Sequence, residues 1–371
     1  MRTIAKTAIP LLFAAALIGC CNSNVETEYN IEKLGKMPDI EEGFGKGVSA
    51  CYAAIGNDTI YVAGGCNFPE VPAAEGGSKR YYKGIFKAAG NSPLKWEKAG
   101  ELPEPSAYGV SLQCGDKWII AGGMNSEGAL NNVYSIDLTD LAIETLPHLP
   151  MYIDNAAGAT SGNRIYITGG NADGIPSAST LMLDLDNLDA GWKFLPAMPS
   201  APRVQPVCAA TDKALYVWGG FAPAGIEEGP AVFVNGVKYE FASGKWSLLG
   251  KTEADGEVIT LSGGIATATG CNSIVVAGGV NKDIFLDAIS GTYNLVPQEE
   301  YMYKPAYWYK FNNRLMLFDT ESEKWSIIAT DSCYARAGAQ MAIGHGEIYL
   351  IGGELKPGIR TPDIYRITLP K

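Results

Sequence analysis

A short hydrophobic run that ends in two glycines recurs six times along this chain of 371 residues. Each run is rich in β-branched and aromatic residues, which is typical of a buried strand, and the copies recur at intervals of roughly 50 residues. The six pairs are Gly64-Gly65, Gly122-Gly123, Gly169-Gly170, Gly219-Gly220, Gly278-Gly279 and Gly352-Gly353. We therefore expect an all-β protein built from six similar units.

The period and the glycine pairs together resemble the kelch repeat, in which each repeat forms one four-stranded blade of a β-propeller. Further signals follow most pairs: an aromatic strand such as residues 133–136, and then a strand that contains a tryptophan or other apolar residues. The chain is thus predicted to form a six-bladed kelch-type β-propeller. The glycines are interpreted as structural, because they let strands approach closely and lack the spacing of a nucleotide-binding loop.

The two ends of the repeat region are complementary. The last unit has strand-like sequence at residues 337–343, 347–352 and 362–369, which is one strand short of a blade. Residues 29–34 form an isolated strand-like run ahead of the first unit. We expect this N-terminal strand to complete the C-terminal blade and close the ring, which removes exposed sheet edges.

The N-terminal region is predicted to direct export. Arg2 and Lys6 precede an apolar run that is too short to span a bilayer, and the run ends in Leu-Ile-Gly-Cys, which resembles a bacterial lipobox. We expect a lipoprotein signal peptide at residues 1–19, lipidation of Cys20, a tether at 20–28 and the propeller at 29–371. An ordinary signal peptide is the alternative. The protein would face the periplasm in the cell envelope and touch the membrane only through its lipid.

Charge and composition exclude several partners. A net charge of −11 and a pI near 4.8 argue against nucleic acid and anionic membrane surfaces. Beyond Cys20 and Cys21 the cysteines are isolated, and the chain has only two histidines, which argues against a zinc or copper site. No metal or cofactor is therefore expected, and an anionic substrate would need a local arginine.

The strongest candidate site follows the last glycine pair. Residues 347–351 alternate as a strand does, and the loop after them carries Glu354 and Arg360. A carboxylate can transfer protons and a guanidinium can bind an anion, so the two form a plausible catalytic pair. The alternative is a surface loop with two solvated charges.

Other polar residues are expected at the same mouth of the central channel. In a four-stranded blade, the loop after the second strand and the loop before the first strand emerge on one face. The candidates in such loops are Lys79, Arg80, Tyr81, Tyr108, Arg203, Asn281 and Arg336. Each could instead be a rim charge or a packed side chain. The aromatic residues at 301–309 could stack on a sugar, cover the mouth or simply pack.

With the repeat in place, one block is similar to a known family. Residues 353–361 match the Gly-Glu-x-Lys-Pro-Gly-x-Arg-Thr motif of the bacterial N-acetylneuraminate epimerases, or sialic acid mutarotases, and residues 107–112, 202–205 and 278–285 support the match. The order of the blades resembles a circularly permuted form of that family.

This resemblance implies interconversion of the α and β anomers of N-acetylneuraminic acid, with Glu354 and Arg360 as the catalytic residues and no cofactor. Arg203, Tyr108, Arg80, Asn281 and Arg336 are expected to bind the sugar acid. Opening the sugar ring requires two proton transfers. The group that performs the second could be Glu354 acting twice, Tyr108 or water.

Three other functions occur on propellers of this kind. A sialidase would carry repeated Ser-x-Asp-x-Gly-x-x-Trp turns, and the chain has one incomplete copy at residues 189–192. A non-catalytic kelch module could bind a glycan or a protein through the same loops, with Glu354 and Arg360 as contacts. A kelch-type copper oxidase lacks a plausible His/Tyr ligand set.

Overall fold

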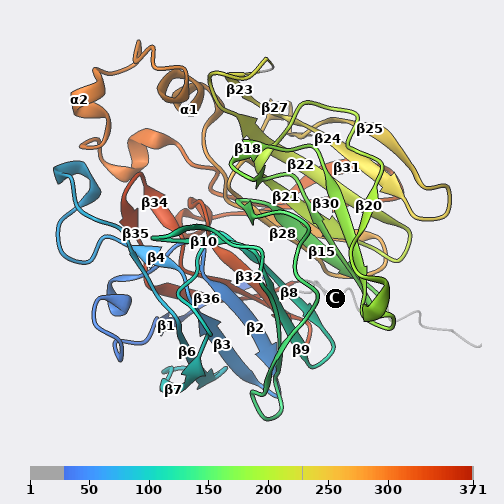
Figure 1. The fold of residues 1–371 in the computed structure, drawn as a ribbon. Helices are drawn as coiled ribbons and strands as arrows, with labels where there is room; N and C mark the ends of the chain where they lie inside the picture. Colours follow the sequence, from blue (N-terminus) through green and yellow to red (C-terminus); the bar gives the residue numbers. More distant parts are fainter. Residues whose placement is uncertain (1–28, 228, 370–371) are drawn as a thin grey trace, which may run out of the picture.

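The computed structural model describes residues 29–227 and 229–369. Within them the chain forms six antiparallel blades of four strands each, with one extra short strand on the fourth blade, which confirms the predicted all-β six-bladed propeller (Figure 1). The innermost strands contact one another in chain order, and that of blade 6 contacts that of blade 1, so the ring is closed. These inner strands are β2 (Tyr52–Gly56), β8 (Val110–Cys114), β15 (Ala157–Ser161), β21 (Val204–Ala210), β28 (Ile265–Ala268) and β32 (Gln340–Gly344).

Three further strands complete each blade, moving outward from the channel. The second strands, which carry or precede the glycine pairs, are β3 (Thr59–Ala63), β9 (Lys117–Ala121), β16 (Arg164–Thr168), β22 (Ala214–Ala222), β29 (Ser273–Ala277) and β33 (Glu347–Ile351). The third are β6 (Gly84–Ala89), β12 (Val133–Asp137), β19 (Thr180–Asp184), β24 (Asn235–Glu240), β30 (Arg314–Asp319) and β36 (Asp363–Thr368). The outermost are β7 (Glu97–Glu101), β13 (Ile143–Thr145), β20 (Lys193–Leu195), β25 (Lys245–Lys251), β31 (Lys324–Thr330) and β1 (Asn30–Lys36).

The N-terminal strand closes the ring as predicted. Strand β1 pairs antiparallel with β36, from Asn30 opposite Thr368 to Lys36 opposite Asp363. Leu34 of this strand is 1% exposed and belongs to the core between blades 6 and 1. The sixth blade is therefore assembled from both ends of the propeller sequence.

The hydrophobic core lies between the blades. Six clusters of buried side chains each combine residues from two successive blades, including one cluster between blade 6 and blade 1. The outer tryptophans bridge the same interfaces: the indole N–H groups of Trp96, Trp192 and Trp246 donate to the main-chain carbonyls of Lys36, Pro147 and Pro196 on the preceding blade, at 2.8, 2.8 and 2.7 Å.

The glycine pairs also join neighbouring blades. The N–H group of Gly123 donates to the carbonyl of Ile153 in the next blade at 2.7 Å, and Gly353 donates to Val48 at 3.0 Å. A Cβ atom on Gly122 would lie 2.4 Å from the Ile153 carbonyl oxygen, and both glycines of this pair have positive φ. Only glycine fits at such an approach, which confirms the structural interpretation of the pairs.

One residue from each blade forms a hydrogen-bonded ring around the channel. The six residues all have left-handed φ angles, and each N–H group donates to the carbonyl of the preceding member. The distances lie between 2.7 and 3.2 Å, and the circle closes from Ala50 to Gly338. We call this the channel ring; its members are Ala50, Tyr108, Asn155, Gln205, Gly263 and Gly338.

Short elements cover the channel mouth near blade 6. Strands β34 (Glu354–Lys356) and β35 (Ile359–Arg360) form a hairpin, and the insertion between β29 and β30 carries α1 (Lys282–Ile289), α2 (Gln298–Tyr301) and the 3-10 turn η4 (Ala306–Tyr309). Figure 1 places α1 and α2 beyond the end of the hairpin. No helix in the described part of the chain is long and apolar enough to cross a bilayer.

Candidate active site

The β34–β35 hairpin sets Glu354 and Arg360 opposite each other. The two residues are paired across the strands, and a turn at Pro357-Gly358 joins them. Arg360 Nη2 lies 3.2 Å from Glu354 Oε2, and the Gly358 N–H group donates to Glu354 Oε1 at 3.0 Å. The hairpin register thus fixes a carboxylate and a guanidinium as a pair, which the spacing in the sequence could only suggest.

Arg360 is buried and only partly satisfied. Its side chain is 4% exposed, Nε donates to Ser49 Oγ at 3.1 Å, and the guanidinium carbon lies 4.9 Å from the centre of the Phe68 ring. Among the described residues Nη1 has no hydrogen-bond partner. A buried guanidinium with a spare donor is suited to binding an anion such as a carboxylate.

The Glu354 carboxyl is surrounded by protein but opens on a pocket. Its side chain keeps 23% exposure, and Glu354 is among the pocket-lining residues. Burial raises the pKa of this carboxyl above its usual 4.5, and Arg360, the Gly358 N–H group and Lys79 oppose that rise. A carboxylate whose pKa moves toward neutrality is a better general base and acid at physiological pH.

The pocket lies between the channel ring and the insertion. It has a volume of about 370 Å³, within the range of ligand sites. Its floor includes Tyr108, Gln205 and Gly338 of the channel ring, and Tyr301 and Tyr309 of the insertion also line it. We call it the mouth pocket.

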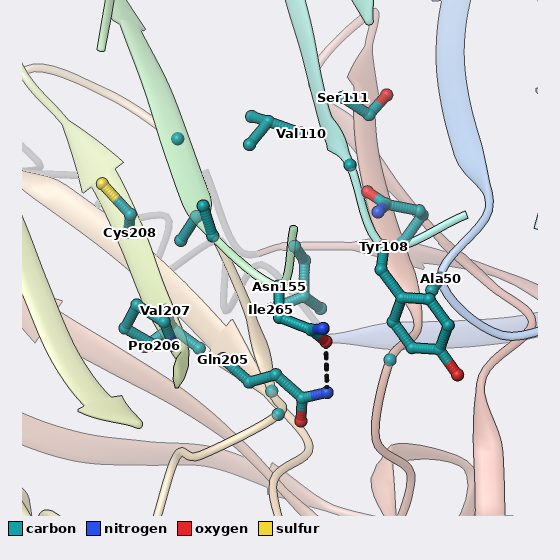
Figure 2. Close-up of a pocket in the computed structure, with 18 of the residues that line it drawn as sticks. Ala50, Tyr108, Val110, Ser111, Asn155, Gln205, Pro206, Val207, Cys208 and Ile265 are labelled. Atoms are coloured by element: carbon teal, nitrogen blue, oxygen red, sulfur yellow. Dashed lines mark hydrogen bonds between the residues drawn. The ribbon is translucent and has the colours of Figure 1, made fainter. Parts of the chain in front are cut away.

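A second cavity, of about 110 Å³, continues from the mouth pocket down the channel. It shares Tyr108, Gln205 and Gly338 with the mouth pocket. Figure 2 shows Tyr108, Asn155 and Gln205 around it, with the Gln205 amide donating to Asn155 Oδ1 at 2.8 Å. The Gln205 amide at the floor of the mouth pocket is therefore held in place by a hydrogen bond.

Comparison with known proteins places the chain in a family. The family model described as N-acetylneuraminate epimerase matches residues 146–371. The chain belongs to the N-acetylneuraminate epimerase family.

Individual relatives extend this result. Proteins named N-acetylneuraminate epimerase match at 27% identity over 230 residues in Salmonella typhimurium (strain LT2), 28% over 232 in Haemophilus influenzae (strain PittEE) and 30% over 233 in Shigella flexneri serotype 5b. Each alignment covers 60% of this chain, and the chain spans about 60% of the relatives' length. A solved structure described as "Structure of YjhT" aligns with a TM-score of 0.62 at 17% identity, covering 87% of this chain and 95% of that chain, which supports the fold.

Several of the residues predicted from sequence meet at the mouth pocket of this epimerase-family protein. Glu354, Tyr108 and Asn281 line it, and Arg360 adjoins it through Glu354. Asn281 also caps α1, because its side-chain oxygen accepts from the N–H groups of Asp283 and Ile284, both at 3.1 Å.

Arg203 and Arg336 lie elsewhere, buried inside their blades. Arg203 Nη1 donates to the Gly219 carbonyl at 2.8 Å and Arg336 Nη1 to the Gly352 carbonyl at 2.6 Å, each within its own blade. Neither arginine lines the mouth pocket. The geometry favours blade packing over the substrate contact that the sequence suggested for both.

Arg80 lies on the rim and Cys20 lies outside the described residues. The Arg80 side chain is 38% exposed, pairs with Glu70 at 2.7 Å and does not line the mouth pocket. Among the residues that the structure describes, no group of three or more His, Cys, Asp or Glu side chains could hold a metal ion.

Sequence reasoning missed Ser49 and Phe68, which contact Arg360. Ser49 directly precedes Ala50 of the channel ring, so counting from the ring position in each blade could have found it. Phe68 lies in the loop between β4 (Cys66–Asn67) and β5 (Arg80–Tyr81), and no periodic signal marks it.

Proposed function

We propose that the protein interconverts the α and β anomers of N-acetylneuraminic acid by opening and reclosing the sugar ring. The observation that carries this proposal is the Glu354–Arg360 pair, with its buried guanidinium, at a pocket large enough for one sugar, in a chain of the epimerase family. Glu354 removes the proton from the anomeric hydroxyl, so that the ring opens to a ketone. The bond to the former anomeric carbon rotates, and the ring recloses on the other face.

Arg360 binds the substrate carboxylate. In N-acetylneuraminic acid that carboxylate is attached to the anomeric carbon, so a fixed guanidinium places the reacting hydroxyl next to Glu354. The unpartnered Nη1 is a donor available for it. General acid–base transfer of this kind typically contributes 10²- to 10⁴-fold.

The test is one-dimensional proton NMR of freshly released α-N-acetylneuraminic acid, following the C3 protons with protein lacking residues 1–21. Wild type should accelerate anomer exchange, and Glu354→Gln and Arg360→Ala should lose that acceleration while staying folded. Glu347→Gln is a matched control, because Glu347 also lies beside an arginine in blade 6, 3.6 Å from Arg366, but does not line the mouth pocket. If wild type binds the sugar but does not accelerate anomer exchange, the protein is a sugar-binding propeller and not an enzyme.

We also propose that the chain is a circularly permuted member of its family. In support, the family model matches one continuous block that begins at residue 146, directly after β13 ends blade 2. A closed ring of blades tolerates a change in where the chain begins and ends, because the arrangement of the blades in space stays the same. A chain that joins residue 371 to residue 29 and begins at residue 146 should fold and keep its activity, since Asn30 and Thr368 are already paired.

We further propose export as a lipoprotein anchored through Cys20 and facing the periplasm. The support is the sequence of residues 1–20 alone. Cys20→Ala should release the protein from membrane fractions of the producing bacterium, and metabolic labelling with a fatty acid should be lost with it.

A further inference from the structure

Tyr108 occupies a backbone position that disfavours its side chain. Its φ is 61°, in the left-handed region, where residues with large side chains are strained. The other members of the channel ring are glycine at two positions and alanine, asparagine and glutamine at the rest. The ring is formed by main-chain atoms, so it does not require an aromatic residue, and the presence of tyrosine needs another explanation.

The phenol oxygen of Tyr108 is held by a lysine. Lys79 Nζ donates to it at 3.0 Å and lies 4.7 Å from the centre of the Tyr108 ring. The centres of the Phe68 and Tyr81 rings each lie 5.9 Å from the same ammonium. Because the oxygen accepts from Lys79, the single O–H hydrogen of the phenol is left to be donated elsewhere.

The phenol lies on the same pocket as the carboxylate. Tyr108 and Glu354 both line the mouth pocket, and the charged or titratable groups near the phenol are Lys79, Arg360, Glu354 and Cys66. Burial raises the pKa of the phenol well above its usual value, and Arg360 opposes the rise. At neutral pH the phenol therefore carries its proton, as a general acid must.

We propose that Tyr108, with Lys79 holding its oxygen, is the second proton-transfer group, which protonates the ring oxygen of the sugar while Glu354 deprotonates the anomeric hydroxyl. This inference rests on the proposed anomer exchange. It assigns Tyr108 a catalytic role and Lys79 a positioning role.

The proton and electron balance closes over one cycle. Glu354 takes the proton of the anomeric hydroxyl, and the electron pair of that O–H bond forms the ketone. The bond from the anomeric carbon to the ring oxygen breaks, its pair stays on that oxygen, and the oxygen takes the proton of Tyr108. The resulting phenolate lies beside the Lys79 ammonium. Reclosure on the opposite face returns one proton to Tyr108 and the other from Glu354 to the new anomeric oxygen.

The test compares Tyr108→Phe and Lys79→Met with wild type by the NMR exchange assay, over a range of sugar concentrations. Tyr108→Phe keeps the ring and the backbone, and we expect its kcat to fall about 10²- to 10⁴-fold with KM within about threefold of wild type. Lys79→Met should lower kcat about tenfold or more. The matched control is Tyr134→Phe. The Tyr134 phenol donates to Glu104 at 3.1 Å and does not line the mouth pocket, so removing its hydroxyl should leave kcat unchanged.

The possible outcomes separate this inference from the proposed function. If Glu354→Gln abolishes exchange but Tyr108→Phe keeps a kcat within about threefold of wild type, the anomer exchange stands and the role of Tyr108 is overturned. A raised KM at unchanged kcat overturns it as well, since the phenol then only contacts the sugar. If wild type itself does not accelerate exchange, both the proposed function and the catalytic role of Tyr108 are wrong.

Discussion

The ammonium of Lys356 lies 2.7 Å from the main-chain carbonyl oxygen of Lys304 and also donates to the Met302 carbonyl at 3.1 Å. Lys356 belongs to the β34–β35 hairpin, whereas both carbonyls belong to the insertion that lines the mouth pocket. A second contact, from Tyr303 Oη to the Ala74 carbonyl at 3.0 Å, ties the insertion to blade 1. The insertion is therefore held over the pocket from two sides.

Replacing Lys356 by methionine should loosen the insertion while leaving Glu354 and Arg360 in place. Hydrogen bonds to a charged group contribute about 1.5–3 kcal/mol each. We expect KM for the sugar to rise about tenfold, with a smaller change in kcat. The NMR exchange assay measures both, and Lys213→Met, at an exposed position outside the mouth pocket, is the control. An unchanged KM would show that the insertion needs no such tether.

The activity should be lost on acidification, with a midpoint above pH 4.5. Burial raises the pKa of Glu354, and a base acts only when it is deprotonated, so lowering the pH through that raised pKa removes activity. Arg360 and Lys79 limit the rise, while the neutral tyrosines Tyr108, Tyr301 and Tyr309 do not ionise in this range. The measurement is kcat/KM between pH 3.5 and 8. A midpoint at or below 4.5 would mean that Glu354 is well solvated or is not the base.

Much of the fold was predictable because it depends on local and periodic signals. Each glycine pair lies at or near the end of a second strand, and six such pairs define six blades. The extra strand at residues 29–34 predicted the closure that β1 and β36 make. Of the candidate site, the sequence suggested Glu354 and Arg360 as a pair in one loop, and only the folded hairpin sets them opposite each other.

The roles of the other arginines were not predictable, because they depend on which acceptors surround a side chain after folding. Arg203 and Arg336 each lie two residues before a member of the channel ring, Gln205 and Gly338, and both point back into their own blades. The sequence predicted that Lys79 lies at the channel mouth. Its contact with Tyr108 depends on the path of a long loop and was not predicted. A loop has no periodic hydrophobic pattern in the sequence from which its path could be predicted.

Replacing Arg203 by methionine should destabilise the protein rather than weaken substrate binding. Arg203 is fully buried, and its loss leaves the carbonyls of Gly219 and Asn235 without their donor. Each unsatisfied buried acceptor costs about 1–3 kcal/mol, so we expect the free energy of unfolding to fall by about 3 kcal/mol. Urea denaturation measures it. A variant as stable as wild type with a raised KM would instead support the substrate contact suggested by the sequence.

Gly338→Ala tests the backbone strain of the channel ring. Gly338 has a φ of 59°, and a Cβ atom there would meet its nearest neighbour, Ser49 Cβ, at 3.5 Å, so space is available and strain alone is measured. Left-handed geometry costs a residue with a side chain about 1–2 kcal/mol, partly offset by the lower entropy of the unfolded chain. We expect the free energy of unfolding to fall by about 1 kcal/mol in urea denaturation.

The matched control for this substitution is Gly250→Ala in β25. A Cβ atom on Gly250 meets no atom within 4 Å, and Gly250 is not among the residues with positive φ, so alanine there should not destabilise the protein. If both variants lose the same stability, the loss comes from the added methyl group and not from the ring position. If only Gly338→Ala loses stability, the ring position itself is strained, and the same strain applies to Tyr108, where a larger side chain is kept in the same conformation.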